Sequence, residues 1–213
     1  SRASSAAILG AGNVGRTLGT GLAAAGHEIL YAVREPDAPK NAALPGPHSR
    51  ALPVRDAVAA ADAVVLTTPW NAAEAALASA GDFGGKPLLD ATNPIGPGFV
   101  LTHGHTDSGA EQVQRWAPSA KVVKAFNTTG VENMADPRYG DAKAVMLVAG
   151  DDADACAVAL RLADELGFEA IRVGGLARAR MLEPMAALWI TLAMSPAHGR
   201  NIAFGLLRRA APA

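Results

Sequence analysis

Short hydrophobic stretches recur along the chain and alternate with longer stretches that are compatible with helices. The hydrophobic stretches have the length and the continuous apolar character of strands that are buried on both faces of a parallel sheet. They comprise Ala6 to Leu9, Glu28 to Val33, Ala63 to Thr67, Pro87 to Asp90, Lys121 to Ala125, Ala144 to Ala149 and Phe168 to Val173. A further short strand is expected near Leu52.

Stretches with helical character separate the predicted strands. They comprise Val14 to Ala25, Arg55 to Ala60, Asn71 to Ala80, Ala110 to Trp116 and Ala153 to Leu166. Alanine is so frequent that the buried face of each helix is obscured, because alanine fits buried and exposed positions equally well. The alternation of strands and helices still predicts an α/β fold of the Rossmann type, with a doubly wound, mostly parallel sheet.

Composition limits the classes to which the protein can belong. A chain of 213 residues with 50% hydrophobic residues and a formal net charge of -1 can bury one full core, and it lacks the basic surplus that indicates nucleic acid. No uninterrupted apolar stretch is long enough to cross a membrane, and no secretory signal pattern is seen, so a cytoplasmic location without membrane contact is expected. The single cysteine, Cys156, is expected to be a buried, unreactive thiol in a helix.

A glycine-rich motif follows the first predicted strand and opens a helix of small residues. The segment Gly10-Ala11-Gly12-Asn13-Val14-Gly15 has the spacing G-x-G-x-x-G. Gly10 would allow a tight turn, Gly12 would let a phosphate approach the backbone, and Gly15 would let the helix pack closely on the strand. Because the free N–H groups of a helix N-terminus bind anions, the motif predicts a dinucleotide site. A turn without a ligand is the alternative, since glycine-rich turns also recur by chance.

The end of the second predicted strand bears on the choice between NAD and NADP. An NAD-preferring site would carry an acidic residue there to bind the ribose hydroxyls, whereas this strand ends in Val33-Arg34. The planar donor fork of Arg34 suits a 2'-phosphate, so NADP is favoured. Lys40 could add a second positive charge. In the alternative interpretation, Arg34 is a solvated loop cation beside Glu35.

Polar residues and prolines follow three of the predicted strands. The segments are Thr67-Thr68-Pro69-Trp70, Ala91-Thr92-Asn93-Pro94 and Ala125-Phe126-Asn127-Thr128-Thr129. Ligands of open parallel sheets bind outside the carboxyl ends of the strands, so all three segments should line one crevice. Pro69 and Pro94 could hold their loops against a cofactor, although each could also be an ordinary proline that begins a loop.

Seven segments of the chain match the pattern of one enzyme family. They are Gly10 to Gly15, Arg34, Leu66 to Trp70, Asp90 to Pro94, Lys124 to Thr128, Ala149 to Asp152 and Arg180 to Pro184. Together they resemble the deazaflavin (coenzyme F420)-dependent NADP oxidoreductases and their bacterial relatives, over nearly the whole chain. The segment from Lys124 to Thr128 is also similar to the NADPH-flavin domain of membrane ferric reductases, whose membrane helices this sequence lacks.

The resemblance implies that NADPH lies along the first half of the sheet and that a deazaflavin ring stacks on its nicotinamide. The residues implied in cofactor binding are Gly10, Gly12, Asn13, Val14, Gly15, Arg34, Thr67, Pro69, Trp70, Asn93 and Ala125. The resemblance also makes Asn93 and Asn127 the residues at the redox centre. It puts Asn127, Met194, Pro196 and His198 in the acceptor pocket. Archaeal members tend to carry a histidine at the position of Asn127.

The sequence divides into two parts. Residues 1–175 form the expected NADP-binding Rossmann domain. Residues 176–213 are rich in methionine and tryptophan and are expected to form a helical segment, since about 38 residues are too few for an independent domain. Apolar patches on a surface usually meet a partner, so this segment is expected to complete the acceptor pocket or the interface of a homodimer.

The segments above contain no obvious acid–base pair. This agrees with direct hydride transfer between two stacked rings, which depends on positioning more than on proton transfer. We therefore predict an oxidoreductase that passes hydride between NADP(H) and a small-molecule acceptor, namely a deazaflavin (F420) or a flavin (FMN or FAD). The alternatives are an NADPH-dependent reductase of free flavin or another small acceptor, and a non-catalytic module that binds NADPH as a sensor.

Two other groups of polar residues are interpreted without chemistry. His103 and His105 have a spacing that suits metal ligands, but no acidic or cysteine partner lies nearby in the sequence, so a loop without metal is expected. Asp151, Asp152 and Asp154 stand where a helix should begin, and carboxylates at that place cap free N–H groups.

Overall fold

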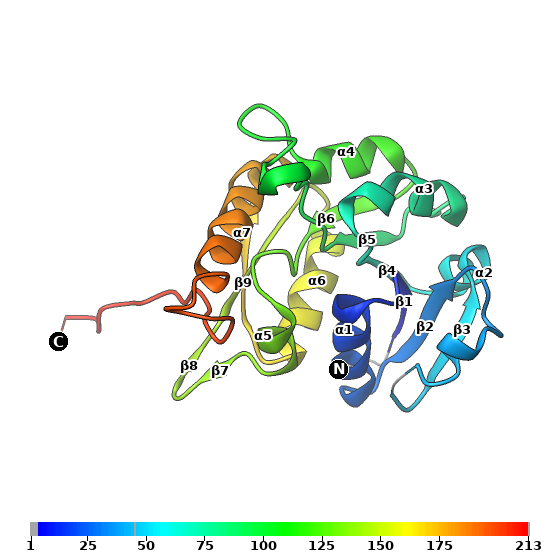
Figure 1. Cartoon of the computed structure of the whole chain (residues 1–213), viewed down its shortest axis with the longest axis horizontal. Coiled ribbons are helices and arrows are strands. Elements are labelled where there is room, and N and C mark those ends of the chain that lie inside the picture. Colours follow the sequence, from blue (N-terminus) through cyan, green and yellow to red (C-terminus); the bar gives the residue numbers. More distant parts are fainter. Residues whose placement is uncertain (1–3, 45, 213) are drawn as a thin grey trace.

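Eight strands form one sheet in the computed structural model, which describes residues 4–44 and 46–212 (Figure 1). The strands are β1 (Ser5–Leu9), β2 (Glu28–Val33), β3 (Ser49–Pro53), β4 (Ala63–Leu66), β5 (Pro87–Asp90), β6 (Lys121–Lys124), β9 (Val145–Gly150) and β10 (Glu169–Gly174). Their order is β10-β9-β6-β5-β4-β1-β2-β3, so the strand order reverses at β1, as in Rossmann folds. The predicted fold is confirmed, and β3 is the short strand expected near Leu52.

The last two strands do not run as predicted. β1 to β6 are parallel, but β9 is antiparallel to β6, with Val123 opposite Gly150, and β10 is parallel to β9. A parallel pair needs a long crossover, usually a helix. Between β6 and β9 the chain forms only the short helix α5 (Val131–Ala135) and the ribbon of β7 (Arg138–Tyr139) and β8 (Ala142–Lys143), so it turns back. The expectation of parallel pairing was therefore wrong for the strand that became β9.

Helices cover both faces of the sheet (Figure 1). One face carries α1 (Asn13–Ala24), α5 and α6 (Ala153–Glu165), and the other carries α2 (Val54–Ala60), α3 (Trp70–Ala80) and α4 (Gly109–Trp116). Short 3-10 turns stand at Pro39–Asn41, Pro97–Phe99 and Leu176–Arg178. β1 serves both layers, because successive side chains of a strand point to opposite faces: Ala6 and Ile8 enter one core, and Ala7 and Leu9 enter the other.

The C-terminal part of the chain begins with one long helix, α7 (Ala179–Ala193). The prediction that the chain stays helical beyond this point was wrong, because Pro196 lacks an N–H group and disfavours helical backbone in the residue before it. The irregular segment that follows reaches the start of β9, where the Val145 N–H donates to the Phe204 carbonyl at 2.9 Å. The end of the chain projects from the molecule (Figure 1). No helix in the described part of the chain is long and apolar enough to span a membrane.

Candidate functional site

The glycine-rich turn between β1 and α1 forms one wall of the candidate site. Gly10 has a φ of 115°, which favours glycine, and a Cβ on Gly15 would stand only 2.0 Å from the Gly10 carbonyl oxygen. Thr67, after β4, closes the turn, since its hydroxyl donates to that same carbonyl at 2.6 Å. A Cβ on Gly12 would meet nothing within 4 Å. The turn is therefore held in shape by its own close packing and by Thr67, and it stays open at Gly12.

The N-terminus of α1 is free to bind an anion. Gly12 is its N-cap residue and has no side chain to cap it, and the first turn contains no acidic residue. Asn13 is exposed and Val14 is half-buried. The first N–H groups of a helix have no partner within the helix, and the positive end of the helix dipole lies there. This end of the turn has the chemistry of a pyrophosphate site.

A cavity of about 560 Å³ lies beside the turn and is lined by three cationic side chains. Arg34 and Lys40 approach it from the segment after β2, and Arg16 approaches it from α1, where its Nε donates to the Ala11 carbonyl at 2.9 Å. Within residues 4–44 and 46–212, neither Arg34 nor Lys40 forms an ion pair. Glu35 also lines the cavity. The charge balance therefore favours an anionic ligand.

Thr68 is a candidate ligand residue that the sequence analysis did not single out. It lines the same cavity, and its hydroxyl oxygen is buried without a hydrogen-bond partner among the described residues. Buried polar groups are nearly always paired, so this hydroxyl is available to a ligand. The neighbouring Thr67 was expected to border the cofactor. Its hydroxyl donates instead to the Gly10 carbonyl of the glycine-rich turn.

Aromatic rings gather at the start of α3. Pro69 is the N-cap residue of this helix and Trp70 is its first residue. The Trp70 indole lies with its centroid 5.3 Å from that of Trp116 and 5.4 Å from that of His103, which it meets edge-on. This packing fixes the ring of Trp70 and gives His103 an aromatic contact. No group of three or more His, Cys, Asp or Glu residues that could hold a metal occurs in the described ranges.

Asn93 and Asn127 form a hydrogen-bonded pair across the ends of β5 and β6. The Asn93 amide nitrogen donates to the Asn127 backbone carbonyl at 2.9 Å, and the Asn127 amide nitrogen donates to Asn93 Oδ1 at 3.0 Å. The same nitrogen of Asn127 also donates to the Leu182 carbonyl of α7 at 3.1 Å. Two acceptors thus fix the orientation of the Asn127 amide, and its Oδ1 is buried without a partner in the part of the chain that is described.

The backbone beside this pair is strained. Phe126 is buried and has a φ of 63°, which is rare for an aromatic residue, and its N–H points to the Met146 sulfur at 3.1 Å. Ala125, which the resemblance places among the cofactor-binding residues, is completely buried. Strained backbone of this kind persists only where its surroundings enforce it, and it is concentrated at functional sites.

A buried lysine, Lys124, contacts the residue that precedes Asn93 in the asparagine pair. Lys124 Nζ is 2.8 Å from Asp90 Oδ2 and 2.8 Å from Glu183 Oε2, and it donates to the Thr92 carbonyl at 2.7 Å. Burial alone would lower the pKa of Lys124, but the two carboxylates offset this and hold the pKa above its ordinary value. Both Lys124 and Asp90 are fully buried. From the sequence, Asp90, Lys124 and Glu183 were parts of matching segments without a predicted role of their own.

The structure does not bring together the three C-terminal residues expected in the acceptor pocket. Met194 lines a cavity of about 260 Å³ between α7 and the loop around Phe99. His198 lines a different cavity, of about 170 Å³, beside Trp189. Pro196 is exposed and lines neither of these cavities.

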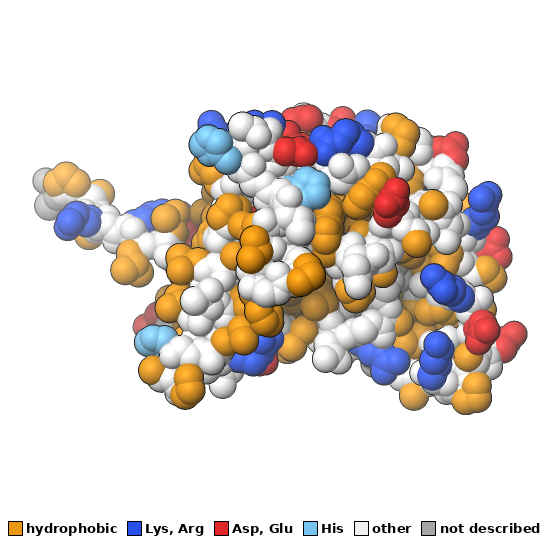
Figure 2. Space-filling view, turned by 45° about the horizontal axis from the view of Figure 1, so that its top comes forward, with side chains coloured by type: hydrophobic (Ala, Val, Ile, Leu, Met, Phe, Trp, Pro, Cys, Tyr) orange, Lys and Arg blue, Asp and Glu red, His pale blue; other side chains and the backbone are white. Residues whose placement is uncertain are grey.

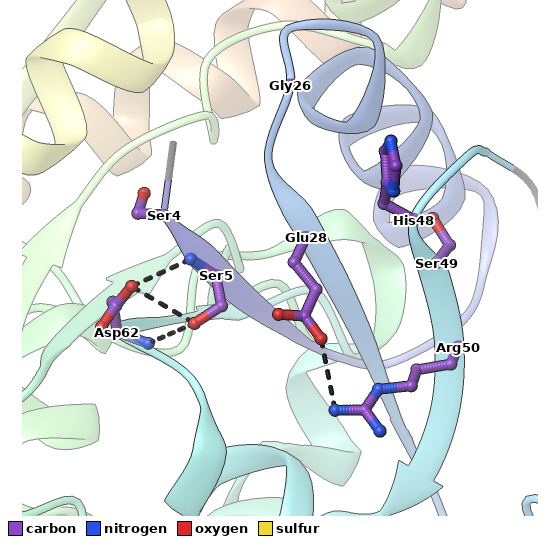
Figure 3. Close-up of a pocket in the computed structure, with 8 residues that line it drawn as sticks. All are labelled: Ser4, Ser5, Gly26, Glu28, His48, Ser49, Arg50 and Asp62. Atoms are coloured by element: carbon purple, nitrogen blue, oxygen red, sulfur yellow. Dashed lines mark hydrogen bonds and ion pairs between the residues drawn. The ribbon is translucent and has the colours of Figure 1, made fainter. Parts of the chain in front are cut away.

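Another cavity, of about 620 Å³, opens at the opposite edge of the sheet (Figure 3). It lies at the amino ends of the strands, where Asp62 accepts a hydrogen bond from the Ser5 N–H at 2.9 Å and Arg50 pairs with Glu28 at 3.2 Å. These charged side chains already have partners. Parallel sheets bind ligands at the carboxyl ends, so the cationic cavity beside Gly10 is the better candidate.

The expectations about polar residues outside the site are confirmed for Cys156 and for Asp152, whereas Asp151 accepts from the Leu176 N–H at 2.9 Å. Cys156 is buried in α6, and burial raises the pKa of its thiol, which disfavours the reactive thiolate. Asp152 is the N-cap residue of α6, and its carboxylate accepts from the Ala155 N–H at 2.8 Å.

Known proteins are similar to this chain in both sequence and fold. The sequence model of the family described as NADP oxidoreductase, coenzyme F420-dependent, matches residues 5–94. The F420-dependent NADP reductase of Methanothermobacter thermautotrophicus is 33% identical over 212 residues, a match that covers 88% of each chain. The metalloreductase STEAP3 of Rattus norvegicus is 29% identical over 178 residues, which are 83% of this chain but only 35% of STEAP3. The structure of a candidate F420-dependent NADP reductase from Arthrobacter sp. FB24 matches with a TM-score of 0.86 and 34% identity, over 96% of this chain and 99% of the other.

Proposed function

Because the chain belongs to the family of coenzyme F420-dependent NADP oxidoreductases, we propose that it passes a hydride directly between NADP(H) and the deazaflavin F420. The observation that carries the nucleotide part of this proposal is the cavity lined by Arg16, Arg34 and Lys40 beside the open glycine-rich turn. In our proposal the pyrophosphate lies at the N-terminus of α1 and the 2'-phosphate lies between Arg34 and Lys40. Thr68 donates its free hydroxyl to the nucleotide.

The asparagine pair supports the acceptor part of the proposal. The Asn127 amide is held in one orientation by Asn93 and Leu182, so its Oδ1, which has no partner among the described residues, can accept a hydrogen bond from an N–H group of a ligand. A nicotinamide carboxamide and a deazaflavin ring both offer such a donor. When bound, the nicotinamide would supply a hydride, with its electron pair, from C4, and the deazaflavin ring would accept it. The contribution of the protein is to hold the rings in contact and to exclude water.

We also propose that the enzyme works as a homodimer whose α7 helices lie at the interface. Large apolar side chains are exposed on α7 and on the facing loop: Phe99, Val100, Met181, Leu188 and Met194. In Figure 2, hydrophobic side chains gather toward the side of the molecule that carries α7, and several basic side chains lie toward the side that carries β2 and β3. A second copy that covered the apolar residues would close the cavity beside Met194. Sedimentation of the wild type and of Leu188→Glu would test this, since the charge should yield monomers.

Stopped-flow mixing tests the reaction itself. The NADPH-loaded enzyme is mixed separately with F420, FMN and FAD, and the loss of each chromophore is followed. Rapid bleaching of F420 with little or no bleaching of FMN and FAD supports the proposal. Reduction of FMN alone would replace it with a flavin reductase, and binding of NADPH without any reduction would replace it with a non-catalytic role.

A further inference from the structure

Helix α7 is anchored to the sheet by one buried carboxylate. Glu183 is 1% exposed, and its Oε2 lies 2.8 Å from Lys124 Nζ. Its Oε1 accepts from the Gly109 N–H at 2.7 Å and its Oε2 from the Ala110 N–H at 3.0 Å, which are the first N–H groups of α4. One side chain therefore connects α7, the end of β6 and the N-terminus of α4.

The anchor is adjacent in the chain to the groups that orient Asn127. Leu182, the residue before Glu183, supplies the carbonyl that accepts from the Asn127 amide at 3.1 Å. Lys124 lies three residues before Asn127, and its Nζ donates to the carbonyl of Thr92, the residue before Asn93. A displacement of Glu183 would thus move one acceptor of the Asn127 amide, and a displacement of Lys124 would move the other.

We infer that Glu183 and Lys124 are positioning residues for the acceptor side of the site, acting through the orientation of the Asn127 amide. The inference deepens the proposed function and rests on it. Lys124 is not a proton donor in this arrangement, because its Nζ donates to the Thr92 carbonyl and is ion-paired with two carboxylates, all within 2.8 Å, and the side chain has no exposure. Its charge instead holds two carboxylates in one place, and through Glu183 it also holds α7 against the start of α4.

The test compares Glu183→Gln with Glu111→Gln. Glu111 is the matched control, because it also joins α4 to α7, through Arg180 Nη2 at 2.7 Å, but it touches neither Lys124 nor the asparagine pair. We expect Glu183→Gln to slow hydride transfer by about ten- to a hundredfold, as small misplacements of reacting groups do, with the dissociation constant of NADPH changed less than about twofold. Glu111→Gln should leave the transfer rate unchanged. Thermal melts select a temperature at which both variants are fully folded.

A double-mutant cycle separates positioning from a general effect on stability. If Glu183 acts through Asn127, then Glu183→Gln combined with Asn127→Ala should be no slower than Asn127→Ala alone. Losses that multiply in the double variant would overturn the inference. Equal rates for Glu183→Gln and Glu111→Gln would overturn it as well.

A readout without turnover distinguishes this inference from the proposed function. In protein labelled with ¹⁵N-asparagine, the Asn127 side-chain amide should exchange its protons slowly, because it donates to Asn93 and Leu182. Glu183→Gln should speed this exchange at least about tenfold, whereas Glu111→Gln should not. If the wild type reduces no acceptor but the exchange result holds, the proposed function fails and the positioning role stands. Unchanged exchange in Glu183→Gln would refute the positioning role whatever the activity.

Discussion

The proposed nucleotide end and the proposed acceptor end of the site are built in opposite ways. At the proposed nucleotide end, the glycine-rich turn comes from one short segment with a single hydroxyl contact from Thr67, and the charges of Arg34 and Lys40 are exposed and unpaired within the described chain. At the acceptor end, Asp90, Lys124 and Glu183 come from distant parts of the chain, and their charges are buried and paired. The first arrangement leaves its charges ready for a ligand. The second uses its charges to hold the protein together.

The largest effect should follow from breaking the acceptor end. Lys124→Met would leave Asp90 and Glu183 as two buried carboxylates without their cation. We expect a loss of about 3–5 kcal/mol in the free energy of unfolding, since an unpaired buried charge is costly. Urea titration of both proteins measures the difference. A variant as stable as the wild type would show that the buried ion pairs do not hold this end together.

The glycine-rich turn should be the next most sensitive place. Gly15→Ala would put a Cβ against backbone that cannot move aside, 2.0 Å from the Gly10 carbonyl oxygen, and we expect a loss of about 2–3 kcal/mol. Gly12→Ala is the control, because its Cβ would meet only open space and should change stability by less than about 0.5 kcal/mol. Gly12→Ala should still weaken NADPH binding, as shown by nucleotide titration. Equal stability losses at the two glycines would contradict the described geometry.

Replacement of Arg34 should change nucleotide binding without changing the fold. Arg34→Ala should weaken NADPH by about 1.5–3 kcal/mol and NADH far less, since only NADPH carries the 2'-phosphate. Calorimetric titration of both nucleotides into both proteins measures this difference, with urea unfolding as the check on stability. Equal losses for NADPH and NADH, or a wild type that prefers NADH, would count against the assignment of the 2'-phosphate to Arg34.

The smallest effect is expected at the partly exposed ion pair between α4 and α7. Hydrogen bonds from Arg180 hold the pKa of Glu111 below its ordinary value of 4.5. The stabilisation is therefore present above pH 4.5 and is lost as the pH falls through the lowered pKa. Glu111→Gln should cost at most about 1 kcal/mol at pH 7, because solvent screens the pair, and almost nothing at pH 2. Unfolding curves at both pH values measure this. A cost that stayed constant with pH would exclude the ionic origin.

The fold was largely predictable because its signals are local. Runs of apolar residues predicted each strand of the main sheet, and the spacing of Gly10, Gly12 and Gly15 predicted the position of the turn. The direction of β9 was not predictable from its own residues, because a run of apolar residues fits a parallel and an antiparallel strand equally well. The difference lies in the connection before it, where α5 is too short to form a crossover.

The candidate site was predictable only in part. Arg34 stands at a position that the motif defines, whereas Arg16 reaches the same cavity from α1, and only its place one helical turn after Gly12 could have indicated it. Lys124 was hidden for a different reason. Its partners Asp90 and Glu183 are 34 and 59 residues away in the sequence. In addition, a charged residue at the end of a strand ordinarily indicates a solvent-exposed position.

The reach of the Glu183 contact has a consequence for how the protein is made. The glycine-rich turn, Thr67 and the three cationic residues all belong to the first third of the chain, so the nucleotide end can take shape early in translation. Lys124 leaves the ribosome well before Glu183, and at 5–20 residues per second it waits several seconds for its second carboxylate. Until then the Gly109 and Ala110 N–H groups at the start of α4 lack their carboxylate acceptor, and the end of β6 carries a lysine with one carboxylate. The growing chain should therefore form the proposed nucleotide pocket first and the proposed acceptor side only when α7 emerges.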